Sequence, residues 1–192
     1  WATCVRIPTS MFDRNEIATP KGLSKLGIEN AGVFLTRGVL LDIAKLKGKE
    51  ILDKGVEVTA TDIKSALEKQ QLDIQPGDAV FIHTGWGSLW KVDNDLYSIG
   101  EPGIGISAAE FLIEKKIALV GSDNWAVEVR PGADPKIQFP VHQLLITLNG
   151  IYILENLDTS ELARDEVYTF AVFFAPLKLT GGTGSPGNPI AI

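Results

Sequence analysis

The sequence holds only two histidines, and one of them stands close to a glutamate with which it could bind a metal. His142 follows Pro140 at the start of one apolar segment, and Glu155 ends a second apolar segment, residues 151–154. Imidazole and carboxylate groups are common ligands of zinc and manganese. A helix after Pro140 and a strand before Glu155, joined by the tight Asn149–Gly150 turn, can bring both side chains to one rim. The pair is therefore a candidate half of a metal site. The alternatives are a packed structural histidine and a solvated glutamate.

A further carboxylate and several aromatic rings follow the other predicted strands. Asp123 closes the apolar segment IALVGSD, at the end of a strand where open α/β sheets bind ligands. It is a candidate general base or a support for the metal site, or else a turn-forming aspartate. Trp86 and Trp125 follow strands too and are candidate walls of an aromatic substrate pocket, as are Trp90 and Tyr97, unless they cover the edges of the core. His83 lies inside the segment AVFIHTGW and is interpreted as a structural histidine.

Other catalytic motifs are missing from the sequence. The loop TGGTGSPGNP lacks the residue order of a phosphate-binding loop, and no strand leads directly into GEPGIG, as a dinucleotide fingerprint requires. There is no Gly-x-Ser-x-Gly elbow, and Cys4 has no histidine near it in sequence. The sequence therefore does not predict a covalent nucleophile.

Alternating strand and helix signals must position these residues. Strands are predicted at residues 33–44, with a polar interruption at 36–38, and at 79–82, 117–123, 151–154 and 168–179. Helices are predicted after a cap at Thr61 or Asp62, after a cap at Ser107, and from Pro140 to Gly150. This alternation indicates an α/β fold. No internal repeat or long linker divides the chain, so residues 1–192 are expected to form one domain.

Composition argues against several classes of partner. The 24 acidic and 18 basic residues give a net charge of −6, so nucleic acids and anionic membrane surfaces are not expected to bind. No apolar run reaches the roughly 18 residues of a membrane-spanning helix. The single cysteine, Cys4, cannot form an internal disulfide, which fits a reducing, cytoplasmic location.

Eight phrases taken together resemble a known family. They are GLSKLGIE (22–29), TRGVLLDIA (36–44), PGDAVFIHTGW (76–86), GEPGIG (100–105), ALVGSDNWAVEV (118–129), PVHQLL (140–145), ILENLD (153–158) and APLKLTGGTGSP (175–186). In order and content they resemble the cyclase family of metal-dependent hydrolases, which includes the bacterial kynurenine formamidases and the isatin hydrolases. The resemblance covers residues 20–192. It implies a swivelling β/β/α-type fold with mixed sheets and flanking helices, assembled as a homodimer or homotetramer.

The resemblance also implies an activity and a set of site residues. The activity is hydrolysis of an amide or cyclic amide, here an aromatic one, by water activated on zinc or manganese. His142, in PVH, and Glu155, in ENL, would serve at the metal. The family's main metal motif, His-x-x-x-His-x-Asp followed by a catalytic histidine, belongs just upstream of the region that matches residues 11–22. Here WATCVRIPTS stands in that place and contains neither histidine nor carboxylate, so residues 1–19 are a divergent N-terminal segment.

Three interpretations follow from this departure. The chain can be the C-terminal portion of a working hydrolase whose other metal ligands lie elsewhere. It can be a degenerate homologue that acts as a small-molecule-binding protein or a partner subunit. It can also be an artefactual fragment whose exposed apolar surface drives oligomerisation.

Overall fold

The computed structural model describes residues 18–134 and 136–192. The predicted divergent segment, residues 1–19, therefore lies outside the described residues except for its last two positions. In the described part of the chain, no helix is both long enough and apolar enough to cross a membrane.

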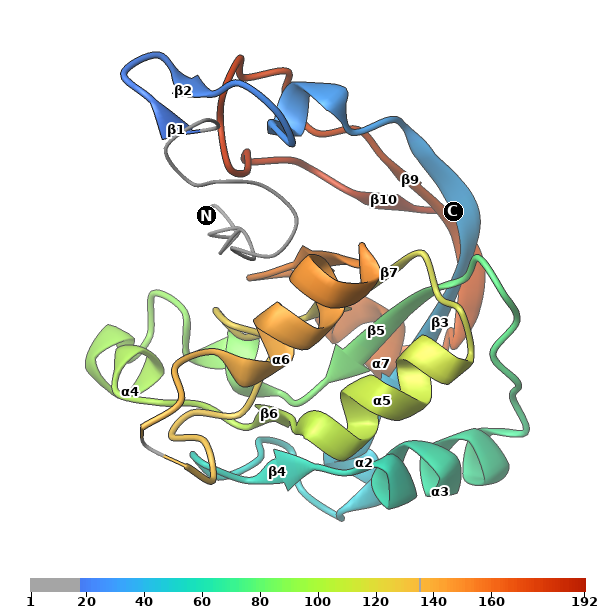
Figure 1. Cartoon of the computed structure of the whole chain (residues 1–192). Coiled ribbons are helices and arrows are strands. Elements are labelled where there is room, and N and C mark those ends of the chain that lie inside the picture. Colours follow the sequence, from blue (N-terminus) through green and yellow to red (C-terminus); the bar gives the residue numbers. More distant parts are fainter. Residues whose placement is uncertain (1–17, 135) are drawn as a thin grey trace.

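A six-stranded mixed sheet forms the centre of the structure (Figure 1). Its strands, in spatial order, are β10 (Ile190–Ala191), β9 (Thr169–Phe174), β3 (Phe34–Asp42), β5 (Ala79–His83), β7 (Leu119–Ser122) and β8 (Tyr152–Leu154). The four strands β3, β5, β7 and β8 are parallel, whereas β9 is antiparallel to β3, and β10 to β9. Two small pairs accompany it, β1 (Ala18–Thr19) with β2 (Gly22–Leu23) and β4 (Glu57–Val58) with β6 (Gly103–Ile104).

Helices cover the parallel strands. The helical segments are η1 (Ile28–Asn30), α2 (Ile43–Leu46), α3 (Ala60–Gln70), η2 (Trp86–Leu89), α4 (Asn94–Ser98), α5 (Ile106–Glu114), α6 (Pro140–His142), η3 (Gln143–Leu148) and α7 (Ser160–Arg164). In Figure 1, α3, α5 and α6 lie in front of the sheet, where apolar side chains of both layers form the larger core cluster. A smaller cluster on the other face includes Phe81, Phe170 and residues of α7. The predicted α/β fold, with a mixed sheet and flanking helices, is confirmed.

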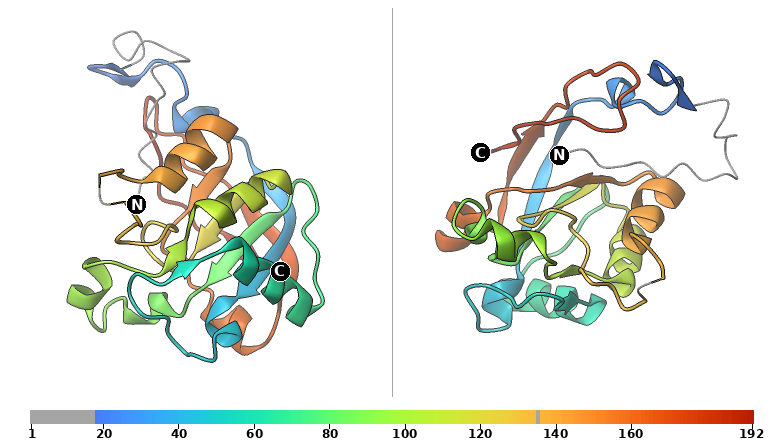
Figure 2. Two further views of the ribbon diagram at one scale, coloured as in Figure 1. Left: turned by 60° about the horizontal axis from the view of Figure 1, so that its bottom comes forward. Right: turned by 90° about the vertical axis from the view of Figure 1, so that its left-hand side faces the viewer.

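An arm extends from this layered body. Figure 2 shows that β3 and β9 continue beyond the helices to β1, β2, η1 and the loop after β9. Backbone hydrogen bonds join the two chain segments that form the arm. The Leu23 amide donates to the Gly181 carbonyl, and the Ile28 amide donates to the Gly182 carbonyl. Segments from opposite ends of the described chain thus support each other.

Several element boundaries differ from those predicted. Helix α3 begins after Thr59 rather than Thr61 or Asp62, because the Thr59 hydroxyl accepts the Asp62 amide while the Asp62 carboxylate accepts the Thr59 amide. Helix α5 begins after Gly105, and Ser107 lies inside it. Residues 87–105, for which the sequence predicts neither helix nor strand, contain α4 and β6.

The polar stretch predicted at residues 36–38 does not break β3. The strand continues because the Arg37 guanidinium binds the buried carboxylate of Asp78, with Nη2 2.6 Å from Oδ2. Gly38 leaves room for the Phe170 ring on the neighbouring strand, since a Cβ at this position would lie 2.3 Å from that ring. These interactions let polar and small residues remain within a central strand.

The close contact between Gly38 and the Phe170 ring predicts the effect of adding a methyl group at position 38. We expect Gly38→Ala to lower the free energy of unfolding by about 1–3 kcal/mol, because the buried Phe170 ring must shift. The matched control is Gly32→Ala, where a Cβ would meet nothing within 4 Å and the change should stay within about 0.5 kcal/mol. Urea unfolding followed by circular dichroism measures both. Equal midpoints for the two variants would contradict the packing argument.

Candidate active site at the carboxyl edge of the sheet

Polar side chains stand at the carboxyl ends of all four parallel strands. Strand β3 ends on Asp42 and β5 on His83, which are paired across the sheet, while β7 is followed by Asp123 and β8 by Glu155. Parallel strands place their carboxyl ends along one edge, and this is the edge at which α/β sheets bind ligands. The sequence thus brings two aspartates, a histidine and a glutamate to one side of the molecule.

His142 and Glu155 lie together at the β8 end of this edge. The His142 Nε2 atom is 3.3 Å from Glu155 Oε1. On the other side of the ring, Nδ1 is 2.5 Å from Glu128 Oε1. Glu128 also accepts the backbone amides of Val141 and His142, so a single buried carboxylate fixes both the imidazole ring and the first turn of α6. The structure therefore places His142 and Glu155 close together, as predicted. Glu128 lies on the opposite side of the imidazole ring.

The charge of the His142 imidazole follows from its neighbours. Burial lowers the pKa, but hydrogen bonds to Glu128 and Glu155, together with their negative charges, raise it to about 9. In the absence of a metal, His142 is therefore a cation between two carboxylates at neutral pH. Sequence reasoning missed Glu128. Its signal is a single carboxylate within the apolar stretch AVEV, because buried carboxylates commonly orient histidines that bind metals.

Aromatic rings lie beside His142. The Phe139 ring lies 5.1 Å from the imidazole and 6.5 Å from the Trp125 ring, in edge-to-face contacts. The Arg130 guanidinium lies over Phe139 at 4.4 Å and Trp125 at 5.6 Å. Among the described residues, the buried indole nitrogen of Trp125 has no hydrogen-bond partner. Trp125 is therefore close to the predicted metal pair.

The loop that carries Trp125 is held by Glu101, whose side chain is fully buried. Its two carboxylate oxygens accept the backbone amides of Trp125 and Ala126, at 2.9 and 2.8 Å. Burial raises the pKa of Glu101 to about 8, although these hydrogen bonds oppose the shift and the charge of Glu155 adds to it.

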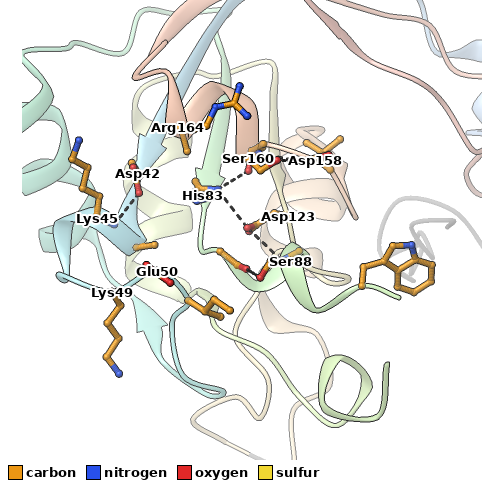
Figure 3. Close-up of a pocket in the computed structure, with 18 of the residues that line it drawn as sticks. Asp42, Lys45, Lys49, Glu50, His83, Ser88, Asp123, Asp158, Ser160 and Arg164 are labelled. Carbon is orange, nitrogen blue, oxygen red and sulfur yellow. Dashed lines mark hydrogen bonds and ion pairs between the residues drawn. The ribbon is translucent and has the colours of Figure 1, made fainter. Parts of the chain in front are cut away.

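A pocket of about 840 Å³ opens at the same edge, over the ends of β3, β5 and β7 (Figure 3). Asp123 and His83 lie on its inner side, with His83 Nδ1 3.5 Å from Asp123 Oδ2 and 2.8 Å from Thr159 Oγ1. Asp123 also accepts the amide and the hydroxyl of Thr84 at 3.0 and 2.6 Å. Neither His142 nor Glu155 lines this pocket.

The structure thus places the predicted site residues in two groups. Asp123 lies with His83, which sequence analysis left out of the site, and its hydrogen bonds suit a positioning carboxylate. Trp86 is buried in the core, where its indole nitrogen donates to the Tyr97 carbonyl, whereas Trp90 lines the pocket. The catalytic role of Asp123 and the substrate contacts of Trp86 and Trp125 stay predictions.

Two candidate metal ligands, His142 and Glu155, would not form a complete site. Within residues 18–134 and 136–192, no group of three or more histidine, cysteine, aspartate or glutamate side chains is placed to hold a metal ion. A catalytic zinc site usually takes three protein ligands and a water. His142 and Glu155 therefore account for part of such a set.

Comparisons with known proteins agree with this fold. The sequence model of the family described as "Putative cyclase" matches residues 19–129. An isatin hydrolase of Roseibium aggregatum is 30% identical over 138 residues, which cover 68% of this chain and 51% of the relative. A cyclase crystal structure superposes with a TM-score of 0.77 at 38% identity, covering 86% of this chain and 57% of its own.

A solved isatin hydrolase bound to the product analogue thioisatinate is also similar. Its TM-score is 0.66 at 28% identity, with 82% of this chain and 60% of that chain covered. The chain spans about half the length of the curated relative it matches. Because the family model matches more than half of the sequence, the chain belongs to the cyclase family.

Proposed function

We propose that this chain supplies His142 and Glu155 to the divalent metal of a hydrolase that cleaves an amide or cyclic amide. The observation that carries the proposal is the 3.3 Å separation of His142 Nε2 and Glu155 Oε1, with Glu128 bound to the opposite ring nitrogen. The similarity to isatin hydrolases supports an aromatic cyclic amide, or an arylformamide, as the substrate class.

The two side chains fit a metal in type and spacing. Two ligand atoms bonded to one tetrahedral ion at about 2.1 Å lie roughly 3.4 Å apart, close to the distance between Nε2 and Oε1. A nitrogen and a carboxylate oxygen suit both zinc and manganese. When bound, such an ion lowers the pKa of a water molecule and polarises the substrate carbonyl, so the reaction needs no covalent nucleophile.

The residues of this chain have separate tasks in the proposed site. Glu128 holds the His142 ring so that Nε2 faces Glu155. The rings of Phe139 and Trp125 offer an apolar wall against which a flat substrate can pack. Asp123 positions His83 at the neighbouring pocket. A small-molecule substrate and a homodimeric or homotetrameric assembly belong to this proposal.

A second candidate function is binding of a small molecule without hydrolysis, alone or as a partner subunit. The observation that favours it is the pocket of about 840 Å³, which does not include the metal pair. The two functions differ in whether the purified protein takes up a metal ion and in whether an amide is cleaved.

Metal uptake tests the first candidate. We expect the purified chain to bind zinc or manganese, and His142→Ala and Glu155→Gln each to weaken that affinity by at least about tenfold, since each removes a ligand. Elemental mass spectrometry and competition with a chelating dye measure it. Glu110→Gln, on the exposed side of α5, is the matched control and should bind as the wild type does. Affinity that is unchanged in all three variants would rule out this pair as ligands.

The pKa of His142 predicts how metal binding depends on pH. Nε2 must lose its proton before it can bind a metal, and the pKa of about 9 lies above the ordinary value for histidine. Apparent zinc affinity should therefore rise roughly tenfold per pH unit at all pH values below about 9 and level off above that value. Glu128→Gln removes a negative charge, so its curve should level off at a lower pH. Superimposable curves for the two proteins would contradict this electrostatic coupling.

A further inference from the structure

The tautomer of His83 is set by the groups around its Nδ1 atom. A carboxylate oxygen of Asp123 lies 3.5 Å from Nδ1, and the Thr159 hydroxyl lies 2.8 Å away. An ionised carboxylate can only accept hydrogen bonds, so the arrangement favours a proton on Nδ1. In the neutral imidazole, Nε2 is then an acceptor.

The Nε2 atom is available to a ligand. No residue that the structure describes forms a hydrogen bond to it, and it is not among the buried polar atoms left without a partner. The side chain is 13% exposed and lines the pocket, as Figure 3 shows. His83 thus offers one fixed acceptor to whatever occupies the pocket.

Most charged groups around the pocket have partners. Its cations each bind a carboxylate outside the lining, in the pairs Lys45–Glu166, Lys49–Asp53 and Arg164–Asp165. Three of its four carboxylates accept backbone amides, Asp42 from Lys45, Asp123 from Thr84 and Asp158 from Ser160, and the fourth, Glu50, is exposed. Because the pocket offers a charged ligand no buried group of opposite charge that lacks a partner, it is better suited to an uncharged ligand.

One wall of the pocket is aromatic. The Trp90 and Tyr97 rings, with centroids 5.4 Å apart, both line it, and Trp90 is half exposed. The Tyr97 hydroxyl donates to Asn156 Oδ1, which holds that ring in place. A pocket that combines an aromatic wall with a positioned hydrogen-bond acceptor is typical of sites for flat small molecules.

We propose that this pocket binds an uncharged aromatic molecule through a hydrogen bond from an N–H or O–H group of the ligand to His83 Nε2, without a metal. The site goes beyond the proposed hydrolase function, since it uses neither His142 nor Glu155. Asp123 and Thr159 act as positioning residues because they keep the proton on Nδ1.

A matched pair of ligands tests the hydrogen bond. Oxindole is an uncharged, flat lactam with an N–H donor, and N-methyloxindole has nearly the same shape without the donor. We expect the wild-type protein in EDTA to bind oxindole at least about tenfold more tightly than N-methyloxindole, measured by tryptophan fluorescence and by nuclear magnetic resonance (NMR) titration. His83→Ala should remove this difference, and the control Glu110→Gln should keep it. Equal affinity for the two compounds in the wild type, or no binding of either, would overturn the proposal.

A second measurement does not depend on ligand binding. The chain has two histidines, so ¹⁵N–¹H correlation of the imidazoles, with His142→Gln to assign the signals, reports the His83 tautomer directly. In alkaline buffer we expect a protonated Nδ1 and an unprotonated Nε2, and a loss of this preference in Thr159→Val with Thr159→Ser as the conservative rescue. A proton on Nε2 in the wild type would overturn the inference. If zinc failed to bind, the inference about His83 would be unaffected. The proposed hydrolase function and the proposed pocket ligand can therefore fail separately.

Discussion

A buried carboxylate is stable only when hydrogen bonds replace the water it has lost, and this constraint organises the site. Three such groups stand near the carboxyl edge of the sheet. Glu101 accepts the amides of residues 125 and 126, Asp123 accepts that of Thr84, and Glu128 accepts those of residues 141 and 142. Each hydrogen-bonded carboxylate therefore joins two segments that are distant in sequence. The loops around the site are held by carboxyl groups that would be costly to bury without these hydrogen bonds.

Backbone conformations that are unfavourable by themselves occur close to these hydrogen-bonded carboxylates. Val127, Phe139 and Asn156 all have positive φ angles, of 62°, 51° and 58°. A β-branched residue such as Val127 rarely adopts this region. Each of the three stands beside site residues: Val127 precedes Glu128, Phe139 precedes α6, and Asn156 follows Glu155. Such strain persists only where surrounding contacts determine it, which is typical of pre-organised sites.

The sequence predicted those features that depend on nearby residues. The strands and the helix after Pro140 follow from the periodicity of apolar residues and from the turn residues between them. The proximity of His142 and Glu155 follows because both lie in one αβ unit. Glu128 and His83 were missed because their roles come from contacts across the fold, from Glu128 to His142 and from His83 to Thr159. The sequence left two alternatives for Trp86, a pocket wall or a cover over the edge of the core. Trp86 is buried and Trp90 is half exposed, and spacing along a loop does not tell which of two nearby rings turns inward. The α3 cap was predicted two or three residues too late, because the reciprocal hydrogen bonds of Thr59 and Asp62 start the helix at Thr59.

The order of the parallel strands in the sheet explains why the two candidate sites lie side by side. Strand β8 ends beside the metal pair, whereas β3 and β5 end at the pocket, and β7 lies between them and leads into both Asp123 and Glu128. The segment from Asp123 to Glu128 therefore supports His83 at one end and His142 at the other. The proximity of His142 and Glu155 depends on β8, α6 and this segment, so it is a property of the described fold.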